Sequence, residues 1–177
     1  ITWDKFIEIG KQVEAKTGHK MIDVDINDAG IIRIMLQSAG SWYFTADGKP
    51  NIANNPVFKA ALTDYQKILQ SDIYKPVSGW NDYTAAFMGG EVASVYTGVW
   101  IVGGIKGNAD LSGKWGVAPI PKLDGVDGAT NFSNLGGSSW YVLSSAPNKD
   151  AAIDFLKTTW AGDVDFYQQI LVGQGAV

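Results

Sequence analysis

The segment 87–100 holds the residue whose type and position best suit ligand chemistry. A helix is expected to end at a Gly-Gly pair, a β-prone run follows over residues 92–97, and Gly98 lets the chain turn before Trp100. This order places Trp100 at the C-terminal edge of a sheet, where an α/β domain presents its ligand surface. A flat indole there is suited to stacking on a sugar ring, and packing in the core is the alternative for the same residue.

A second candidate site begins at Gly136 and Gly137, which precede a β-prone segment. Two consecutive glycines let backbone amides approach a ligand closely, although a flexible loop that enters a strand has the same pattern. If residues 139–143 form a strand, Trp140 and its neighbour point to opposite faces, so one can pack in the core while the other faces a cleft. Trp42, close after a glycine, has the same two interpretations.

The polar run at residues 23–28 resembles the start of a calcium loop. Its sixth position is Asp28 instead of glycine and its twelfth is Ile34 instead of glutamate, so the calcium interpretation is disfavoured. An acidic helix start, stabilised by the helix dipole, explains the run as well. The oxygens of Asp25 and Asn27 at this strand-to-helix turn are also good acceptors for sugar hydroxyls.

Most other chemistries lack their residues. The chain has no cysteine, one histidine (His19) and no glycine-rich phosphate loop or nucleophile-elbow motif. Acidic residues that could hydrolyse glycosides are plentiful, but their spacing singles out no pair. The net charge of −4 and the pI near 4.8 give no support to nucleic-acid binding. We therefore expect no catalytic residue, no cofactor and no metal.

The composition predicts a folded domain. The chain has 177 residues, of which 46% are hydrophobic and 18% charged, and no apolar run approaches the roughly 20 residues of a membrane span. The chain opens at a helix cap and residues 173–177 follow without a closing element, so we expect a piece of a longer protein.

Helices and short strands are expected to mix without a strict βαβ rhythm. Helices are predicted over residues 2–17, 27–39, 55–69, 81–88, 99–106, 148–160 and 163–171. Strands are predicted over residues 21–24, 42–45, 92–97, 115–118 and 139–143, with residues 49–52 pairing back on 42–45. Residues 72–80 are expected to be a connection, and Trp3, Trp115 and Trp160 are expected to pack inside.

Several segments, taken in order, carry a resemblance to a known family. They are residues 2–6, 38–49, 87–100, 116–121 and 136–155. Together they resemble the second lobe of the family 1 extracellular solute-binding proteins, the sugar-binding components of bacterial ABC importers. Glu91 and Ser94 replace the usual lysine and methionine of one motif, at positions that we interpret as structural.

The resemblance implies a periplasmic-binding-protein-like type II lobe of the α/β class, in which helices surround a short mixed sheet. Residues 1–177 would form this single lobe, and the first lobe, with much of the ligand site, would lie outside the chain. The two lobes of this family close on the ligand by a hinge motion.

The resemblance also assigns residues to the ligand. By this resemblance, Trp100 is the platform on which the sugar stacks, and Gly136 and Gly137 bring backbone groups near the ligand. Asp25 and Asn27 would lie near the loop that makes polar contacts with the sugar. Trp42 and Trp140 are secondary candidates.

The implied partners are a sugar or oligosaccharide ligand, the permease subunits of an ABC transporter and the missing first lobe, with no nucleic acid. The implied location is extracellular, as a cell-surface lipoprotein or in the periplasm, with membrane contact only through a lipid anchor outside this chain. The expected function is carbohydrate binding for import without catalysis. Two alternatives stay open: a glycoside hydrolase fragment that uses carboxylates on the same cleft, and a free-standing carbohydrate-binding domain.

Overall fold

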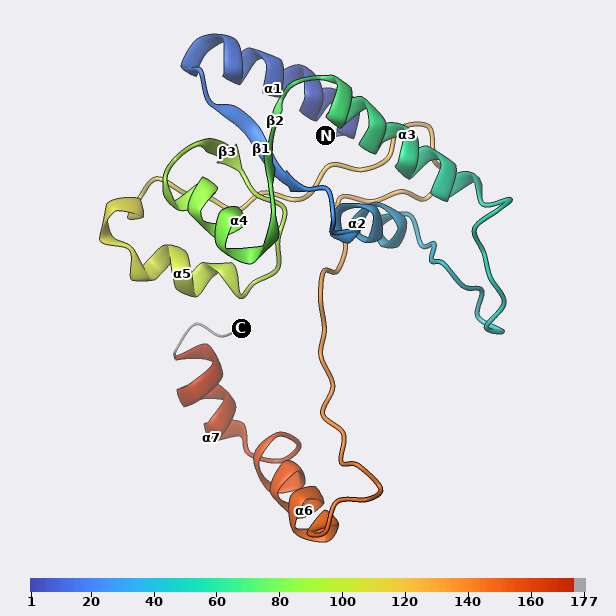
Figure 1. The fold of residues 1–177 in the computed structure, drawn as a ribbon, viewed down its shortest axis with the longest axis vertical. Helices are drawn as coiled ribbons and strands as arrows, with labels where there is room; N and C mark the ends of the chain where they lie inside the picture. Colours follow the sequence, from blue (N-terminus) through green and yellow to red (C-terminus); the bar gives the residue numbers. More distant parts are fainter. Residues whose placement is uncertain (174–177) are drawn as a thin grey trace. The chain divides into compact units, whose positions relative to one another are not determined.

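The computed structural model describes residues 1–173 (Figure 1). The chain divides into two compact units. The first unit combines Ile1–Tyr96 with Gly116–Leu135, and the second combines Thr97–Trp115 with the chain from Gly136 onward. The expectation about the end of the chain falls on residues 174–177, outside the described residues. The single-lobe boundary of 1–177 stays a prediction.

A three-stranded sheet forms the centre of the first unit. Its strands are β1 (Lys20–Asp25), β2 (Tyr74–Val77) and β3 (Val92–Ser94), in the order β2-β1-β3. Both strand pairs are parallel, where we expected mixed directions, and Ile22 pairs with Tyr74 on one side and Ser94 on the other. Because the strands are parallel, their carboxyl ends meet at one edge of the sheet.

Strand β2 replaces part of the predicted connection at residues 72–80. The segment is short and contains Pro76, which lacks an N–H and argues against a central strand. Its place at the edge of the sheet makes proline tolerable, since one side of an edge strand needs no ladder bonds.

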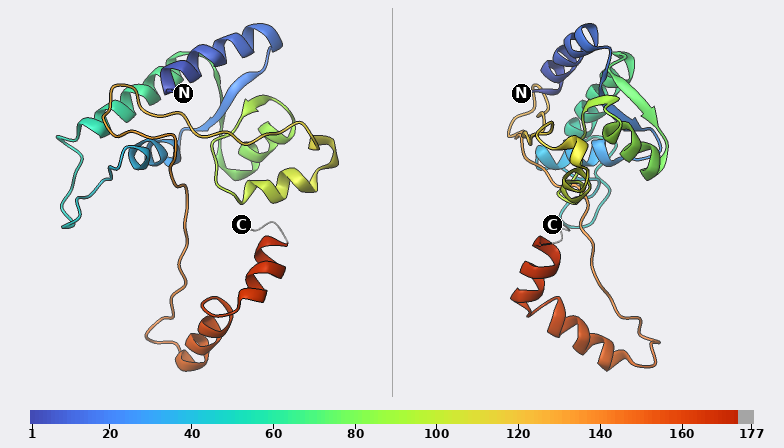
Figure 2. Two further views of the ribbon diagram at one scale, coloured as in Figure 1. Left: turned by 180° about the vertical axis from the view of Figure 1, so that it is seen from behind. Right: turned by 90° about the vertical axis from the view of Figure 1, so that its left-hand side faces the viewer.

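Four helices surround this sheet: α1 (Trp3–Thr17), α2 (Gly30–Ser38), α3 (Pro56–Gln70) and α4 (Gly79–Met88). Helices α1 and α3 lie side by side (Figures 1 and 2). Alternation along β1 separates two faces of the sheet. Ile22 and Val24 belong to the core shared with α1, α2 and α3, whereas Asp25 bonds to the start of α4.

Local capping explains the helix limits that the sequence predicted. The Thr2 hydroxyl accepts the Lys5 N–H at 3.3 Å, and α1 ends at Gly18, whose φ is 74°. The Asn55 side chain accepts the N–H groups of Val57 and Phe58 at the start of α3. Helix α2 begins later than predicted, at Gly30, where the Asp28 carboxylate accepts the first N–H at 3.0 Å.

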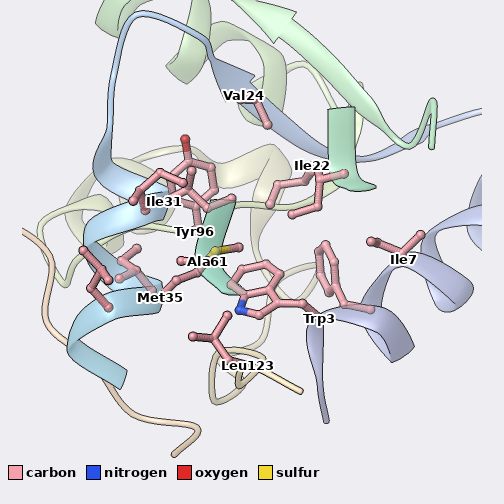
Figure 3. Packing of buried hydrophobic residues seen from close by; sticks show 14 of the residues in the cluster. Trp3, Ile7, Ile22, Val24, Ile31, Met35, Ala61, Tyr96 and Leu123 are labelled. Carbon is pink, nitrogen blue, oxygen red and sulfur yellow. The ribbon is translucent and has the colours of Figure 1, made fainter. Parts of the chain in front are cut away.

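The core of the first unit is built around Trp3 (Figure 3). Trp3 is 1% exposed, and its ring meets the edge of Phe6 at 5.6 Å between centroids. Helix α2 contributes Ile31 and Met35 to the same cluster, so the expected packing role of Trp3 is confirmed. The distant residue Leu123 completes it, 1% exposed.

Hydrogen bonds hold the segment 116–135 to the N-terminus of the same unit. The Trp3 N–H donates to the Lys122 carbonyl at 3.1 Å, and the Lys122 N–H donates to the Ile1 carbonyl at 3.0 Å. The Asn131 amide donates to the carbonyls of Ile1 and Ile120, both at 2.7 Å. The segment 116–135, which has no regular helix or strand, is therefore fixed to the first unit by hydrogen bonds.

The second unit contains α5 (Ile101–Gly107), the 3-10 turn η1 (Ala109–Leu111), α6 (Lys149–Thr159), α7 (Val164–Phe166) and the π-helical segment η2 (Tyr167–Val172). The helices expected at 99–106 and 148–160 are thus confirmed within two residues. The strands expected at 115–118 and 139–143 were wrong, because neither segment pairs with a strand in the described chain. Among residues 1–173, no helix has the length and apolar character needed to span a membrane.

Candidate functional site at the carboxyl edge of the sheet

Asp25, the last residue of β1, links the end of this strand to the start of α4. Its Oδ1 accepts the Asn27 N–H at 2.9 Å, and its Oδ2 accepts the Gly79 N–H at 2.7 Å. Ser78 precedes α4 without a side-chain capping bond in the described structure. The carboxylate of Asp25 thus serves as the cap of a helix that begins 54 residues later.

The same hydrogen bonds set the charge of Asp25. The N–H groups of Asn27 and Gly79 hold the pKa of Asp25 below its ordinary value, so its carboxylate is ionised near neutral pH. A carboxylate offers about four acceptor positions, and these backbone bonds use two of them. Asp25 can therefore orient α4 and still accept hydroxyl groups from a ligand. Asn27 is exposed beside it, at the turn that follows β1.

The other carboxylates of the polar run at residues 23–28 have different surroundings. The Asp28 carboxylate accepts a hydrogen bond from the Arg33 guanidinium at 2.8 Å and another from the Gly30 N–H. Asp23 is 0% exposed. Neither oxygen of Asp23 has a hydrogen-bond partner within the described residues, and burial raises the pKa of Asp23 to about 7. Across residues 1–173, no group of three or more His, Cys, Asp or Glu side chains could hold a metal ion.

Trp42 packs in a row of three aromatic rings with Tyr43 and Phe58. Its ring lies 4.9 Å from that of Tyr43, which in turn meets the edge of Phe58 on α3 at 5.8 Å. The Trp42 carbonyl accepts the Asn51 amide at 3.2 Å. Trp42 keeps 36% of its surface exposed, so it has a partly open face.

In the second unit, Trp100 packs against glycine backbone. A Cβ at Gly136 would come within 2.9 Å of the Trp100 ring, and one at Gly98 would overlap the same ring. Gly136 and Gly137 have φ values of 86° and 100°, a region that favours glycine. The two segments that the sequence singled out therefore meet at one indole, which stays 39% exposed.

Trp140 belongs to a separate aromatic cluster in the second unit. Its ring lies 5.3 Å from that of Trp160, which also contacts Phe166 and Tyr167 edge to face. The packing role expected for Trp160 has support here. Trp140 remains 67% exposed, so most of its surface can still reach a ligand.

Sequence reasoning missed Trp80, the second residue of α4. Trp80 is 56% exposed, follows Gly79 directly and stacks on Tyr83 with centroids 5.8 Å apart and an angle of 22° between planes. The pattern that revealed Trp100, a glycine and a tryptophan after a β-prone run, is also present here. It was overlooked because residues 72–80 were interpreted as a connection.

A hollow of about 550 Å³ lies elsewhere in the first unit, along α3. Its lining is largely apolar and includes Ile52, Phe58, Leu62 and Leu69. None of the candidate ligand residues lines it, so we do not assign the site to this hollow.

The parallel sheet and the helices around it define an α/β protein. Comparison with protein families makes this more specific: the family model of the bacterial extracellular solute-binding proteins matches residues 1–169. The chain belongs to this family.

The relatives most informative about the ligand are three sugar-binding proteins. The chain is 55% identical over its whole length to the lactose-binding protein of Rhizobium radiobacter and covers 42% of that protein. It is 28% identical, over 88% of its length, to the arabinooligosaccharide-binding proteins of Halalkalibacterium halodurans and Bacillus subtilis, and covers 36% of each. The chain thus spans less than half the length of these relatives.

Proposed function

We propose that this chain is part of the substrate-binding component of an ABC importer and that it binds a carbohydrate for uptake, without catalysis. The observation that carries the proposal is the partly exposed Trp100 indole, which lies against the backbone of Gly136 and offers a flat surface on which a sugar ring can stack. Membership of the solute-binding family and similarity to three sugar-binding proteins support it.

Each candidate residue has a role in this proposal. Trp100 packs on the C–H face of the sugar, and the glycine pair at 136–137 lets backbone groups come near the ligand. Asp25, ionised near neutral pH, accepts sugar hydroxyls in charge-assisted hydrogen bonds, and the Asn27 amide adds a neutral donor and acceptor. Trp42 and Trp140 are secondary stacking surfaces.

The proposal includes the rest of the transporter. The ligand lies between this part of the protein and a first lobe, and the loaded protein delivers it to membrane permease subunits. Its location is extracellular or periplasmic, and a lipid anchor outside this chain supplies any membrane attachment. Lactose and arabinooligosaccharides are the first ligands to test, because the names of the relatives give these sugars as their ligands.

Binding is favoured over glycoside hydrolysis by the carboxylates at the end of β1. A glycosidase needs an accessible acid with a raised pKa and a second carboxylate across the bond. Asp23 has the raised pKa but is 0% exposed, whereas backbone N–H groups lower the pKa of Asp25. Neither residue combines access with a raised pKa, so this pair does not suit hydrolysis.

The test uses the full-length protein that contains this chain. Isothermal titration calorimetry with lactose and with an arabinooligosaccharide is expected to show saturable binding, and both sugars should be recovered intact after hours of incubation. Cleavage that one Asp or Glu substitution abolishes would assign the protein to the glycoside hydrolases instead. Absence of binding to every sugar in a thermal-shift screen would overturn the proposal.

A further inference from the structure

Trp80 is a large exposed aromatic residue that the sugar-binding proposal has not used. It lies in the first turn of α4 and is 56% exposed. The residue before it, Gly79, donates its N–H to Asp25 Oδ2 at 2.7 Å. The Asp25 carboxylate is therefore bonded to the backbone of the residue that precedes Trp80, at the edge of the sheet where β1 ends.

Trp80 stacks on a buried tyrosine that has further contacts of its own. Tyr83 is buried, and its hydroxyl donates to the Tyr96 carbonyl at 2.7 Å. The rings of Tyr83 and Tyr96 also meet edge to face at 6.2 Å. Tyr83 is thus held at both its ring and its hydroxyl. Trp80 stacks on the Tyr83 ring, which covers one face of the indole, and 56% of the Trp80 surface stays exposed.

This pairing of groups matches the chemistry of a sugar ring. A flat indole packs on the C–H face of a pyranose, and a neighbouring carboxylate with unused acceptor positions binds hydroxyls at the ring's edge. Asp25 is held in place by two backbone bonds before any ligand arrives, so little conformational entropy is lost when a hydroxyl binds. Both groups lie in the first unit, so their relation depends on that unit alone.

We infer that Trp80 and Asp25 together bind one ring of the sugar ligand, Trp80 by stacking on its face and Asp25 by accepting its hydroxyls. The inference rests on the proposed function, since it names a subsite of the same carbohydrate-binding protein. It adds Trp80 to the residues that contact the ligand.

The first experiment measures lactose affinity by calorimetry in the full-length protein. Trp80→Ala and Trp80→Leu are both expected to weaken binding about 10-fold or more, because neither offers a flat face, and Trp80→Phe should retain part of the affinity. Phe132→Ala removes an aromatic ring that is 74% exposed in the same unit and should bind as the unchanged protein does. Leucine that fully restores affinity would show that only packing on Tyr83 matters and would overturn the inference.

A double-mutant cycle tests whether the two residues share one ring. If Trp80 and Asp25 hold the same ring, the effects of Trp80→Ala and Asp25→Asn on lactose affinity are non-additive by about 3-fold or more. Additive effects, or unchanged affinity in Trp80→Ala, would refute the inference while leaving the proposed function intact. An unchanged full-length protein that binds no sugar at all would instead refute the proposed function.

Discussion

The backbone of Gly136 lies against the indole of Trp100, so close that a Cβ at position 136 would come 2.9 Å from the ring. The φ of Gly136 is 86°, which L side chains rarely adopt. Glycine is thus required here twice, for the backbone conformation and for the space that the indole fills. The contact brings the two segments that the sequence singled out, around Trp100 and around Gly136, together at one indole.

Replacing Gly136 with alanine should therefore impair ligand binding through Trp100. The left-handed backbone costs alanine about 1–2 kcal/mol of stability, and the added methyl group pushes the indole from its place. We expect lactose affinity in the full-length protein to fall about 10-fold, measured by calorimetry.

Gly113→Ala provides the matched control for Gly136→Ala. Gly113 lies in the same unit with a φ of 74°, and nothing lies within 4 Å of a Cβ placed there. The control should lose similar stability in urea unfolding without loss of affinity. Equal affinity losses in the two variants would mean that backbone strain, and not displacement of Trp100, causes the effect.

Removing the Trp100 ring should weaken sugar binding directly. We expect Trp100→Ala to cost about 1–3 kcal/mol of binding free energy in the full-length protein, and Trp100→Phe to cost less because a smaller flat ring remains. Calorimetry on both variants checks the order. Unchanged affinity in Trp100→Ala would remove Trp100 from the ligand site.

The buried carboxyl of Asp23 should make stability depend on pH. Burial raises its pKa in the folded state to about 7, from the ordinary value of 3.8 that it has in the unfolded chain. Between these values the folded state binds more protons, so the free energy of unfolding falls as pH rises from about 4 to about 7 and then levels off. The loss is on the order of 2–4 kcal/mol.

Asp23→Asn should remove most of that slope, since the amide does not titrate. Urea unfolding at pH 5, 7 and 8.5 measures it, with the exposed Asp127→Asn as control. A slope that persists in Asp23→Asn would show that another group is responsible.

The chain by itself should bind sugar poorly. It covers 42% of the lactose-binding relative, and part of a two-lobed clamp buries only part of the ligand. We expect the 177-residue chain to bind lactose at least about 100-fold more weakly than the full-length protein. Comparable affinities in calorimetry, with folding verified by circular dichroism, would contradict this expectation.

The sequence alone determined the features that depend on neighbours within a few residues. Thr2, Gly18, Asn55 and Pro56 set helix limits through capping bonds and backbone angles that span one turn, and these predictions were confirmed. Trp100 and the glycine pair at 136–137 were also recognisable as candidate ligand residues, because a tryptophan close to glycine and two consecutive glycines can be read directly from the sequence.

Strands were predicted less well because a strand is stabilised by a partner elsewhere in the chain. Tyr74–Val77 forms β2 despite Pro76, since β1 pairs with it and the edge position tolerates proline. Residues 139–143 have suitable β-forming side chains but no paired strand in the described structure. Intrinsic preference does not decide such cases, because hydrogen bonds between distant segments outweigh it.

Only the tertiary structure decided what the polar and aromatic residues of the site do. Asp23 and Asp25 are two positions apart, yet the structure buries one completely and gives the other the N–H of Gly79 at the strand's end. Trp80 became a candidate only when β2 carried it to the same edge as Asp25. Trp100 gained a fixed orientation when Gly136 came to lie against its ring. Burial, charge and ring orientation depend on contacts across dozens of residues, and a local pattern does not contain them.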